Sequence, residues 1–248
     1  MDSAEIIRNA VIGVTALRES ATRDPALLQA VREVKRFQAG RFANTYADLL
    51  QASRYRGAAR FFLDELYGDK DYSSRDIQFA RIAGALQTLF PYQVVATAVK
   101  LAKLHALTES LDHQMGRAWL ALTEVVQPMP AISYVKAWRS VGRLEGRDAQ
   151  LAGVLEIGQE LDRLTRMPGL RMMLRMMRRP ARAAGLSSLQ AFLESGFETF
   201  AAMGGQGAGA TEFLGIICRR ESALIASLFS AELVTCVKML CPRDRAAY

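Results

Sequence analysis

The sequence is poor in the residue types that build metal centres and disulfide frameworks. It contains three cysteines, Cys218, Cys236 and Cys241, and two histidines among 248 residues. An odd number of cysteines gathered near one end does not form a disulfide framework, which is typical of a protein in a reducing compartment. No second cysteine pair and no neighbouring histidine accompany Cys236 and Cys241, so a structural zinc site is disfavoured. We interpret the cysteines as small apolar side chains and expect no metal site.

Long apolar runs are also missing. The two most apolar stretches, residues 89–107 and 222–240, each contain charged side chains, whereas a membrane-spanning helix needs roughly 18 uninterrupted apolar residues. The first ten residues, MDSAEIIRNA, begin with acidic side chains, the reverse of the order in a secretory signal. We therefore expect a cytoplasmic protein with no transmembrane segment.

Alternating runs of β-branched residues, which are typical of strands, are nearly absent. Apolar residues instead recur at steps of three and four along most of the chain. Because no long polar linker divides the sequence, we expect residues 1–248 to form a single all-α domain of about eight to ten helices. Asp24 followed by Pro25 predicts a helix start, and Pro91 predicts the start of a long helix toward residue 126. Further helices are expected over 132–144, 148–166, 169–179, 188–203 and 211–240, the last of them continuous, bent or divided.

The stretch from Ala58 to Arg81 predicts two helices joined by a charged loop. Its first half has an aromatic-rich apolar stripe, and Gly68 follows as a helix-ending residue. Ser73 with Asp76 three residues later matches a capping box at the start of the second helix. We interpret Asp76 as a helix cap and the other carboxylates of this loop as surface charge.

The segment FFLDELYG (61–68), followed by Arg75 and Asp76, resembles a motif shared by an uncharacterised group of bacterial helical proteins. The similarity extends to LHALTESLD (104–112), to the arginine-rich segment and to the glycine- and phenylalanine-containing helix near the C-terminus. The resemblance implies an all-helical fold over most of the chain. It carries no established activity and no catalytic or ligand-binding residue.

An uneven charge distribution is the strongest functional signal. Residues 163–182 contain seven arginines and no acidic residue, a charge equal to the net charge of +7 of the whole chain. Arginines at three- and four-residue steps, with leucine and methionine opposite them, predict a basic amphipathic helix over 169–182. Such a helix binds an acidic protein groove or an anionic lipid surface, and the alternative is a core helix with a solvated arginine face. The proposed partner-binding residues are Arg171, Arg175, Arg178 and Arg182.

Nucleic acid is the least favoured partner, because no recognition motif accompanies the basic patch. Sequence motifs for nucleotide binding and for nucleophilic catalysis are missing as well. We therefore favour a non-enzymatic binding or regulatory protein over an enzyme.

His105, Glu109 and His113 fall on one face of one expected helix. Helical rise separates the two histidines by about 12 Å, too far to bind one ion, and neither has the Glu-x-x-His spacing of di-iron proteins. No cofactor is therefore predicted, although haem needs only one axial histidine, which leaves His105 open as a ligand. The alternative function is a helical small-molecule or haem-binding protein. Its aromatic pocket would contain Phe61, Phe62, Tyr67, His105 and Phe197.

Overall fold

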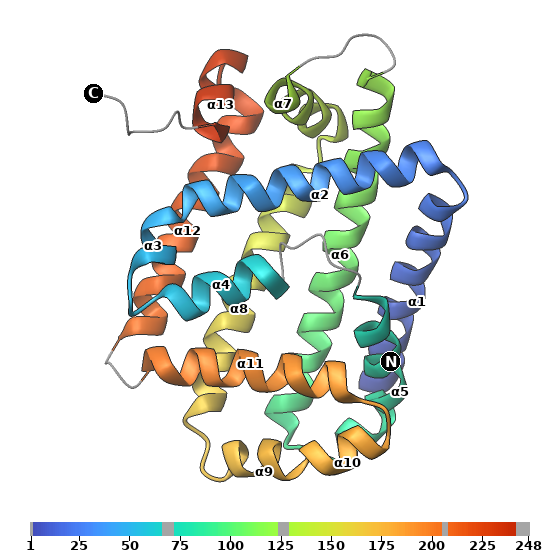
Figure 1. Cartoon of the computed structure of the whole chain (residues 1–248), viewed down its shortest axis with the longest axis vertical. Coiled ribbons are helices and arrows are strands. Elements are labelled where there is room, and N and C mark those ends of the chain that lie inside the picture. The colour runs from blue at the N-terminus through green and yellow to red at the C-terminus, as the bar shows by residue number, and fades with distance from the viewer. Residues whose placement is uncertain (1, 66–71, 124–128, 205–207, 242–248) are drawn as a thin grey trace.

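The computed structural model describes residues 2–65, 72–123, 129–204 and 208–241. Within these residues the chain forms α-helices and turns and no strand (Figure 1), so the expected all-α fold is confirmed. Eleven helices in the described ranges have seven residues or more, slightly more than expected. None of the described helices is both long and apolar enough to cross a membrane.

The helices of the first half, from the N-terminus, are α1 (Ser3–Thr22), α2 (Pro25–Thr45), α3 (Ala47–Gln51), α4 (Arg56–Glu65), α5 (Ser73–Leu89) and α6 (Tyr92–Thr123). Those of the second half are α7 (Pro130–Val141), α8 (Leu144–Thr165), α9 (Leu170–Met176), α10 (Arg178–Ala183), α11 (Ser187–Gly204), α12 (Gly209–Ser230) and α13 (Leu233–Leu240).

The predicted starts of two helices, α2 and α6, are confirmed. The Asp24 carboxylate accepts hydrogen bonds from the backbone N–H groups of Ala26 and Leu27, both at 3.1 Å, and α2 begins at Pro25. The long helix α6 begins directly after Pro91. The predicted helix end at Gly68 lies outside the described residues.

The basic segment forms two short helices where one was expected. α9 ends at Met176, and α10 begins at Arg178 after a turn at Met177. Pro180 explains the break, because proline has no N–H to donate to the carbonyl four residues earlier and its ring clashes with that carbonyl. The last expected helix is likewise divided, into α12 and α13.

The long helix α6 organises the fold. It packs against α1, α2, α7 and α8 and runs along most of the molecule in Figure 1, with α2 crossing it near one end. The crossing is close: a Cβ atom at Gly116 of α6 would lie 2.4 Å from Cγ2 of Val31 on α2. Glycine at this position therefore permits the approach of the two helices.

Among the described residues, the core consists of several apolar clusters. One contains Trp119, Tyr134 and Trp138 and joins α2, α6, α7, α12 and α13. The next contains many aromatic side chains, including Phe42 and Phe200. Burial of such large side chains contributes roughly 1.5–3 kcal/mol each, so these clusters hold the helices in place.

Candidate ligand-binding site

An apolar cavity of about 120 Å³ lies among α4, α5, α6, α8, α9 and α11. Among the described residues that line it, Thr97 alone has a polar side chain, and its hydroxyl donates to the backbone oxygen of Gln93 at 2.8 Å. The described lining is therefore almost entirely apolar. Its wall includes Phe61, Phe62, Leu101, Leu170, Leu174 and Leu193.

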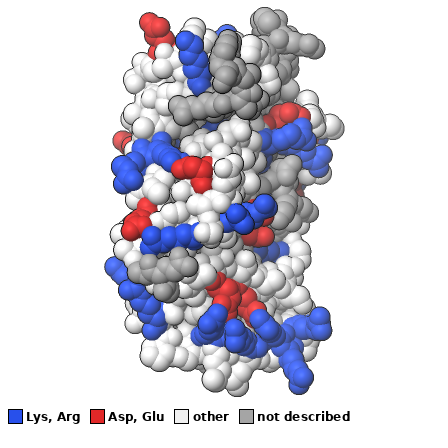
Figure 2. All heavy atoms as spheres, turned by 60° about the vertical axis from the view of Figure 1, so that its left-hand side comes forward, with Lys and Arg blue, Asp and Glu red and all other residues white. Residues whose placement is uncertain are grey.

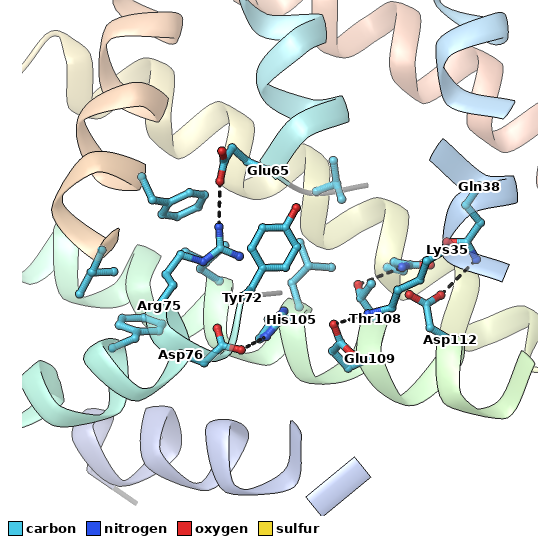
Figure 3. Close-up of a pocket in the computed structure, with 17 residues that line it drawn as sticks. Lys35, Gln38, Glu65, Tyr72, Arg75, Asp76, His105, Thr108, Glu109 and Asp112 are labelled. Carbon is cyan, nitrogen blue, oxygen red and sulfur yellow. Dashed lines mark hydrogen bonds and ion pairs between the residues drawn. The ribbon is translucent and has the colours of Figure 1, made fainter. Parts of the chain in front are cut away.

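A second cavity, of about 80 Å³, is lined by charged and polar side chains. Figure 3 shows them converging from α2, α4, α5 and α6. We call this the polar cavity, and its polar lining residues are Lys35, Gln38, Glu65, Tyr72, Arg75, Asp76, His105, Thr108, Glu109, Asp112 and Gln150.

The polar and apolar cavities adjoin. Six side chains line both of them, namely Phe79, Leu101, Leu104, Val154, Leu189 and Phe192. The two cavities are therefore neighbours, one with polar lining and the other apolar.

Asp76 is a buried carboxylate of the polar cavity with two basic partners. Its Oδ2 atom lies 2.8 Å from Nη1 of Arg18 and 2.9 Å from Nε2 of His105. Burial alone would raise the pKa of Asp76, but the hydrogen bond and charge of His105, together with Arg18, outweigh burial and hold this pKa below its ordinary value. The interpretation of Asp76 as a helix cap is wrong, because its carboxylate points to α1 and α6 and no side chain caps α5 at Tyr72.

Glu109 lies on α6, four residues after His105, and it also has two basic partners. Its Oε1 atom lies 2.7 Å from Nζ of Lys35 and 3.6 Å from Nη2 of Arg18. Burial opposes ionisation of Glu109, but the charge and hydrogen bond of Lys35 outweigh burial and lower its pKa. Arg18 therefore contacts both Asp76 and Glu109, two carboxylates that line the polar cavity.

Arg75 lies at the border between the two cavities. Its guanidinium group is sandwiched by the rings of Tyr72 and Phe192, with its central carbon 4.2 Å and 4.3 Å from their centroids. Its Nη1 atom also lies 3.2 Å from Oε2 of Glu65. This sandwich orders a cationic group beside Phe192, which lines both cavities.

Asp112 differs from the other carboxylates of the polar cavity. It is buried, and Gln38 Nε2 donates to its Oδ1 atom at 3.1 Å. Burial raises the pKa of Asp112 despite the nearby positive charges of Lys35 and Arg147. A carboxyl group that stays protonated can donate a hydrogen bond as well as accept one.

The residues of the expected aromatic pocket lie in several places. Phe61 and Phe62 line the apolar cavity and His105 lines the polar one. Phe197 is buried beside the apolar cavity, in a cluster with Leu164, Leu170 and Leu174, while Tyr67 lies outside the described residues. The sequence interpretation did not predict that Asp76, Glu109 and Asp112 are buried in one cavity. The spacing of Asp76 after Ser73 indicated a helix cap instead.

The histidines do not form a common site. Nε2 of His105 is engaged by Asp76, so ligation of haem iron through this atom would require breaking an ion pair. Nε2 of His113 accepts a hydrogen bond from Arg117 at 3.4 Å, and burial lowers the pKa of His113. Among the described residues, no group of three or more His, Cys, Asp or Glu side chains could hold a metal ion.

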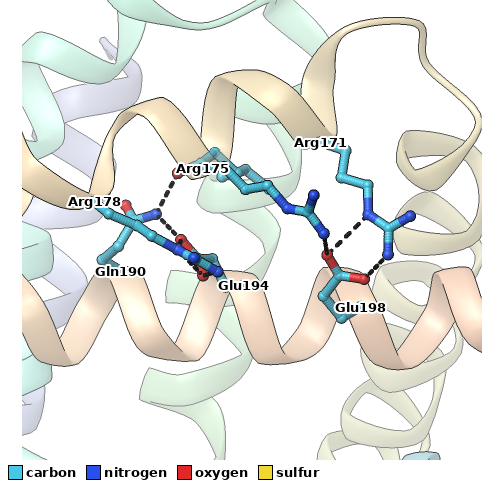
Figure 4. A network of polar contacts seen from close by, with 7 residues as sticks. Arg171, Arg175, Arg178, Gln190, Glu194 and Glu198 are labelled. Carbon is cyan, nitrogen blue, oxygen red and sulfur yellow. Dashed lines mark hydrogen bonds and ion pairs between the residues drawn. The ribbon is translucent and has the colours of Figure 1, made fainter.

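The proposed partner-binding arginines lie on the surface and contact carboxylates of α11. Arg171 and Arg175 pair with Glu198, and Arg178 pairs with Glu194 at 2.6 Å (Figure 4). Their side chains remain 54%, 55% and 59% exposed. Figure 2 shows basic side chains around acidic ones at the lower end of the molecule, where Figure 1 places α9 and α10. Arg182 is exposed too.

The described residues form an all-helical protein with a polar and an apolar cavity side by side. The profile of a family described as a domain of unknown function, DUF8198, matches residues 17–234, and the chain belongs to this family. No curated protein and no solved structure matches the chain. The match confirms that the chain belongs to an uncharacterised family, whereas the shared motif, the bacterial origin and the cytoplasmic location stay predictions.

Proposed function

We propose that this protein binds a small amphipathic molecule, with the apolar body in the apolar cavity and a hydrogen-bonding end in the polar cavity. The observation that supports the proposal is the set of six side chains that line both cavities, which places a polar cavity directly beside an apolar one. Concave, mostly apolar sites with a few convergent polar groups are typical of small-molecule binding.

The size of the space limits the ligand. The cavities of about 80 and 120 Å³ compare with an engineered cavity of about 150 Å³ that binds benzene. A molecule of roughly ten non-hydrogen atoms fits this volume. An alcohol, amide or phenol of that size would bury its apolar part at about 0.8 kcal/mol per CH₂ group.

The segments that carry the family resemblance support the same site. FFLDELYG (61–68) supplies Phe61 and Phe62 to the apolar cavity and Glu65 to the polar one. Arg75 and Asp76, together with LHALTESLD (104–112), supply most of the remaining polar wall. We propose that the shared motif of the family serves this cavity.

Calorimetric titration with straight-chain alcohols from butanol to octanol tests the proposal. We expect affinity to rise about fourfold per CH₂ group until the cavity is full. Ala98→Phe fills the apolar cavity and should abolish binding, whereas Ala149→Phe, on the exposed side of α8, should not. Equal binding by both variants, or no binding of any alcohol by the folded protein, would overturn the proposal.

A second candidate function is the contact of α9 and α10 with an acidic protein or an anionic lipid surface, through Arg171, Arg175, Arg178 and Arg182. The observation that favours it is the exposure of two methionines beside these arginines, with Met172 67% and Met176 71% exposed. Adaptable apolar side chains among cationic ones suit such a surface.

A further inference from the structure

A third cavity, of about 40 Å³, lies among α2, α7, α8 and α12. We call it the basic cavity. Six of its lining side chains are polar or aromatic and buried, namely Gln38, Arg41, Tyr134, Trp138, Arg147 and Glu221.

The indole N–H of Trp138 has no hydrogen-bond acceptor among the described residues, although it is buried and its residue lines this cavity. An indole nitrogen only donates, so its partner must be an acceptor. Because a buried donor without an acceptor is costly, the group that completes the site is one that accepts hydrogen bonds.

The charges of the lining favour an anion. Its described lining includes two arginines, Arg41 and Arg147, and one acidic residue, Glu221. Glu221 Oε1 already accepts hydrogen bonds from Arg41 Nη1 and, at 2.8 Å, from the hydroxyl of Tyr46. Oε1 of Glu221 is therefore already paired with Arg41 and Tyr46 on the α2 side of the cavity.

Arg147 lies on the opposite side, beside Trp138. Its guanidinium carbon is 4.0 Å from the centroid of the Trp138 ring, and its Nη1 atom donates to Gln150 Oε1 at 3.3 Å. Asp112 also interacts electrostatically with Arg147, but Asp112 is not among the residues that line this cavity. Among the described lining residues, positive charges therefore outnumber negative ones.

We propose that the basic cavity binds a small monovalent anion, such as chloride or formate, held by the Trp138 N–H and the Arg147 guanidinium. The volume is roughly three times the minimum that holds one water molecule, which suits a monatomic or triatomic anion. Gln38 and Gln150 line both this cavity and the polar cavity, so the two adjoin. The site goes beyond the proposed amphipathic ligand and does not depend on it.

Thermal unfolding in sodium chloride, sodium formate and sodium gluconate at equal ionic strength tests the proposal. Gluconate is too large for the cavity, so the unfolding midpoint should rise with chloride or formate concentration and not with gluconate. Trp138→Phe keeps the ring and removes the donor, and it should weaken the apparent anion affinity at least tenfold. Trp119→Phe, which changes a buried tryptophan outside this cavity, should leave the affinity unchanged.

A crystal of the unsubstituted protein soaked in sodium bromide gives a second readout that does not depend on a variant folding. We expect an anomalous bromide peak within hydrogen-bond distance of Trp138 Nε1. Identical unfolding curves in the three salts, or water in place of bromide at this position, would overturn the proposal.

Discussion

Oδ2 of Asp76 lies 2.9 Å from Nε2 of His105, and Arg18 brings a second positive group to 2.8 Å from the same oxygen. Through these contacts, one carboxylate oxygen of α5 pairs with a side chain of α1 and a side chain of α6. They also form one wall of the polar cavity, so the same ion pairs serve the stability of the fold and the shape of the proposed site.

Asp76→Asn should lower the free energy of unfolding by roughly 3 kcal/mol, because Arg18 and His105 lose a buried partner. Urea denaturation at pH 7 measures this loss. Asp48→Asn is the matched control: Asp48 lies 2.7 Å from Arg220 but is 57% exposed, so we expect a loss below about 1 kcal/mol. Equal losses in the two variants would contradict a structural role for the buried pair.

The pKa of Asp76 and that of Glu109 are lowered in the folded protein. Groups with lowered pKa values stabilise the fold above their unfolded pKa values, about 4, and this stabilisation is lost as the pH falls through the folded values. Asp76→Asn should therefore flatten the acid side of the stability profile. Urea midpoints between pH 3 and 7 check this, and parallel profiles for the two proteins would rule it out.

Asp112 should behave in the opposite sense, because burial raises its pKa in the folded state. Its contribution is fully present below the unfolded pKa and is lost as the pH rises through the folded value. Asn stays neutral, so the stability of Asp112→Asn relative to the unsubstituted protein should increase with pH. Denaturation between pH 4 and 9 measures the difference, and a constant difference would show that Asp112 does not titrate differently on folding.

Much of the fold could be predicted because its signals are local. The cap at Asp24 and the three- to four-residue spacing of apolar side chains need no knowledge of distant residues. The break between α9 and α10 was also readable, since Pro180 stands in the expected helix, but the arginine periodicity favoured one continuous helix.

The site was much less predictable. His105 pairs with Asp76 across 29 residues, and Lys35 pairs with Glu109 across 74. Sequence spacing carries no information about such contacts, and the spacing of Asp76 after Ser73 matched a common cap instead. Of the residues that the sequence assigned to a pocket, Phe61 and Phe62 line the apolar cavity and His105 lines the polar one.

The close crossing of α2 and α6 gives a prediction on packing. Gly116→Ala should destabilise the protein although alanine favours helices, because the new methyl group would meet Val31 at 2.4 Å. Gly40→Ala is the control, since nothing lies within 4 Å of a Cβ atom there, and it should gain up to about 1 kcal/mol. A stabilising Gly116→Ala would mean that the helices are further apart than described.

The proposed contact of α9 and α10 with an anionic lipid surface can be tested by substituting the glutamates that pair with its arginines. Glu194→Gln with Glu198→Gln frees Arg171, Arg175 and Arg178, so binding to vesicles containing phosphatidylserine should strengthen, by about 1 kcal/mol per charge at low salt. Co-sedimentation measures the binding.

The control carries the same change of net charge elsewhere. Glu19 and Glu33 form exposed pairs on α1 and α2, and replacing both with glutamine should leave vesicle binding nearly unchanged. Equal strengthening by the two double variants would show that net charge, not this surface, drives association.

A crystal structure with 8-bromo-1-octanol tests the central claim most directly, because bromine marks the apolar end of the ligand by its anomalous scattering. We expect the bromine peak in the apolar cavity near Leu170 and Leu174, with the hydroxyl group in the polar cavity. Bromine found only on the protein surface, or cavities filled by rearranged side chains, would contradict the proposed amphipathic site.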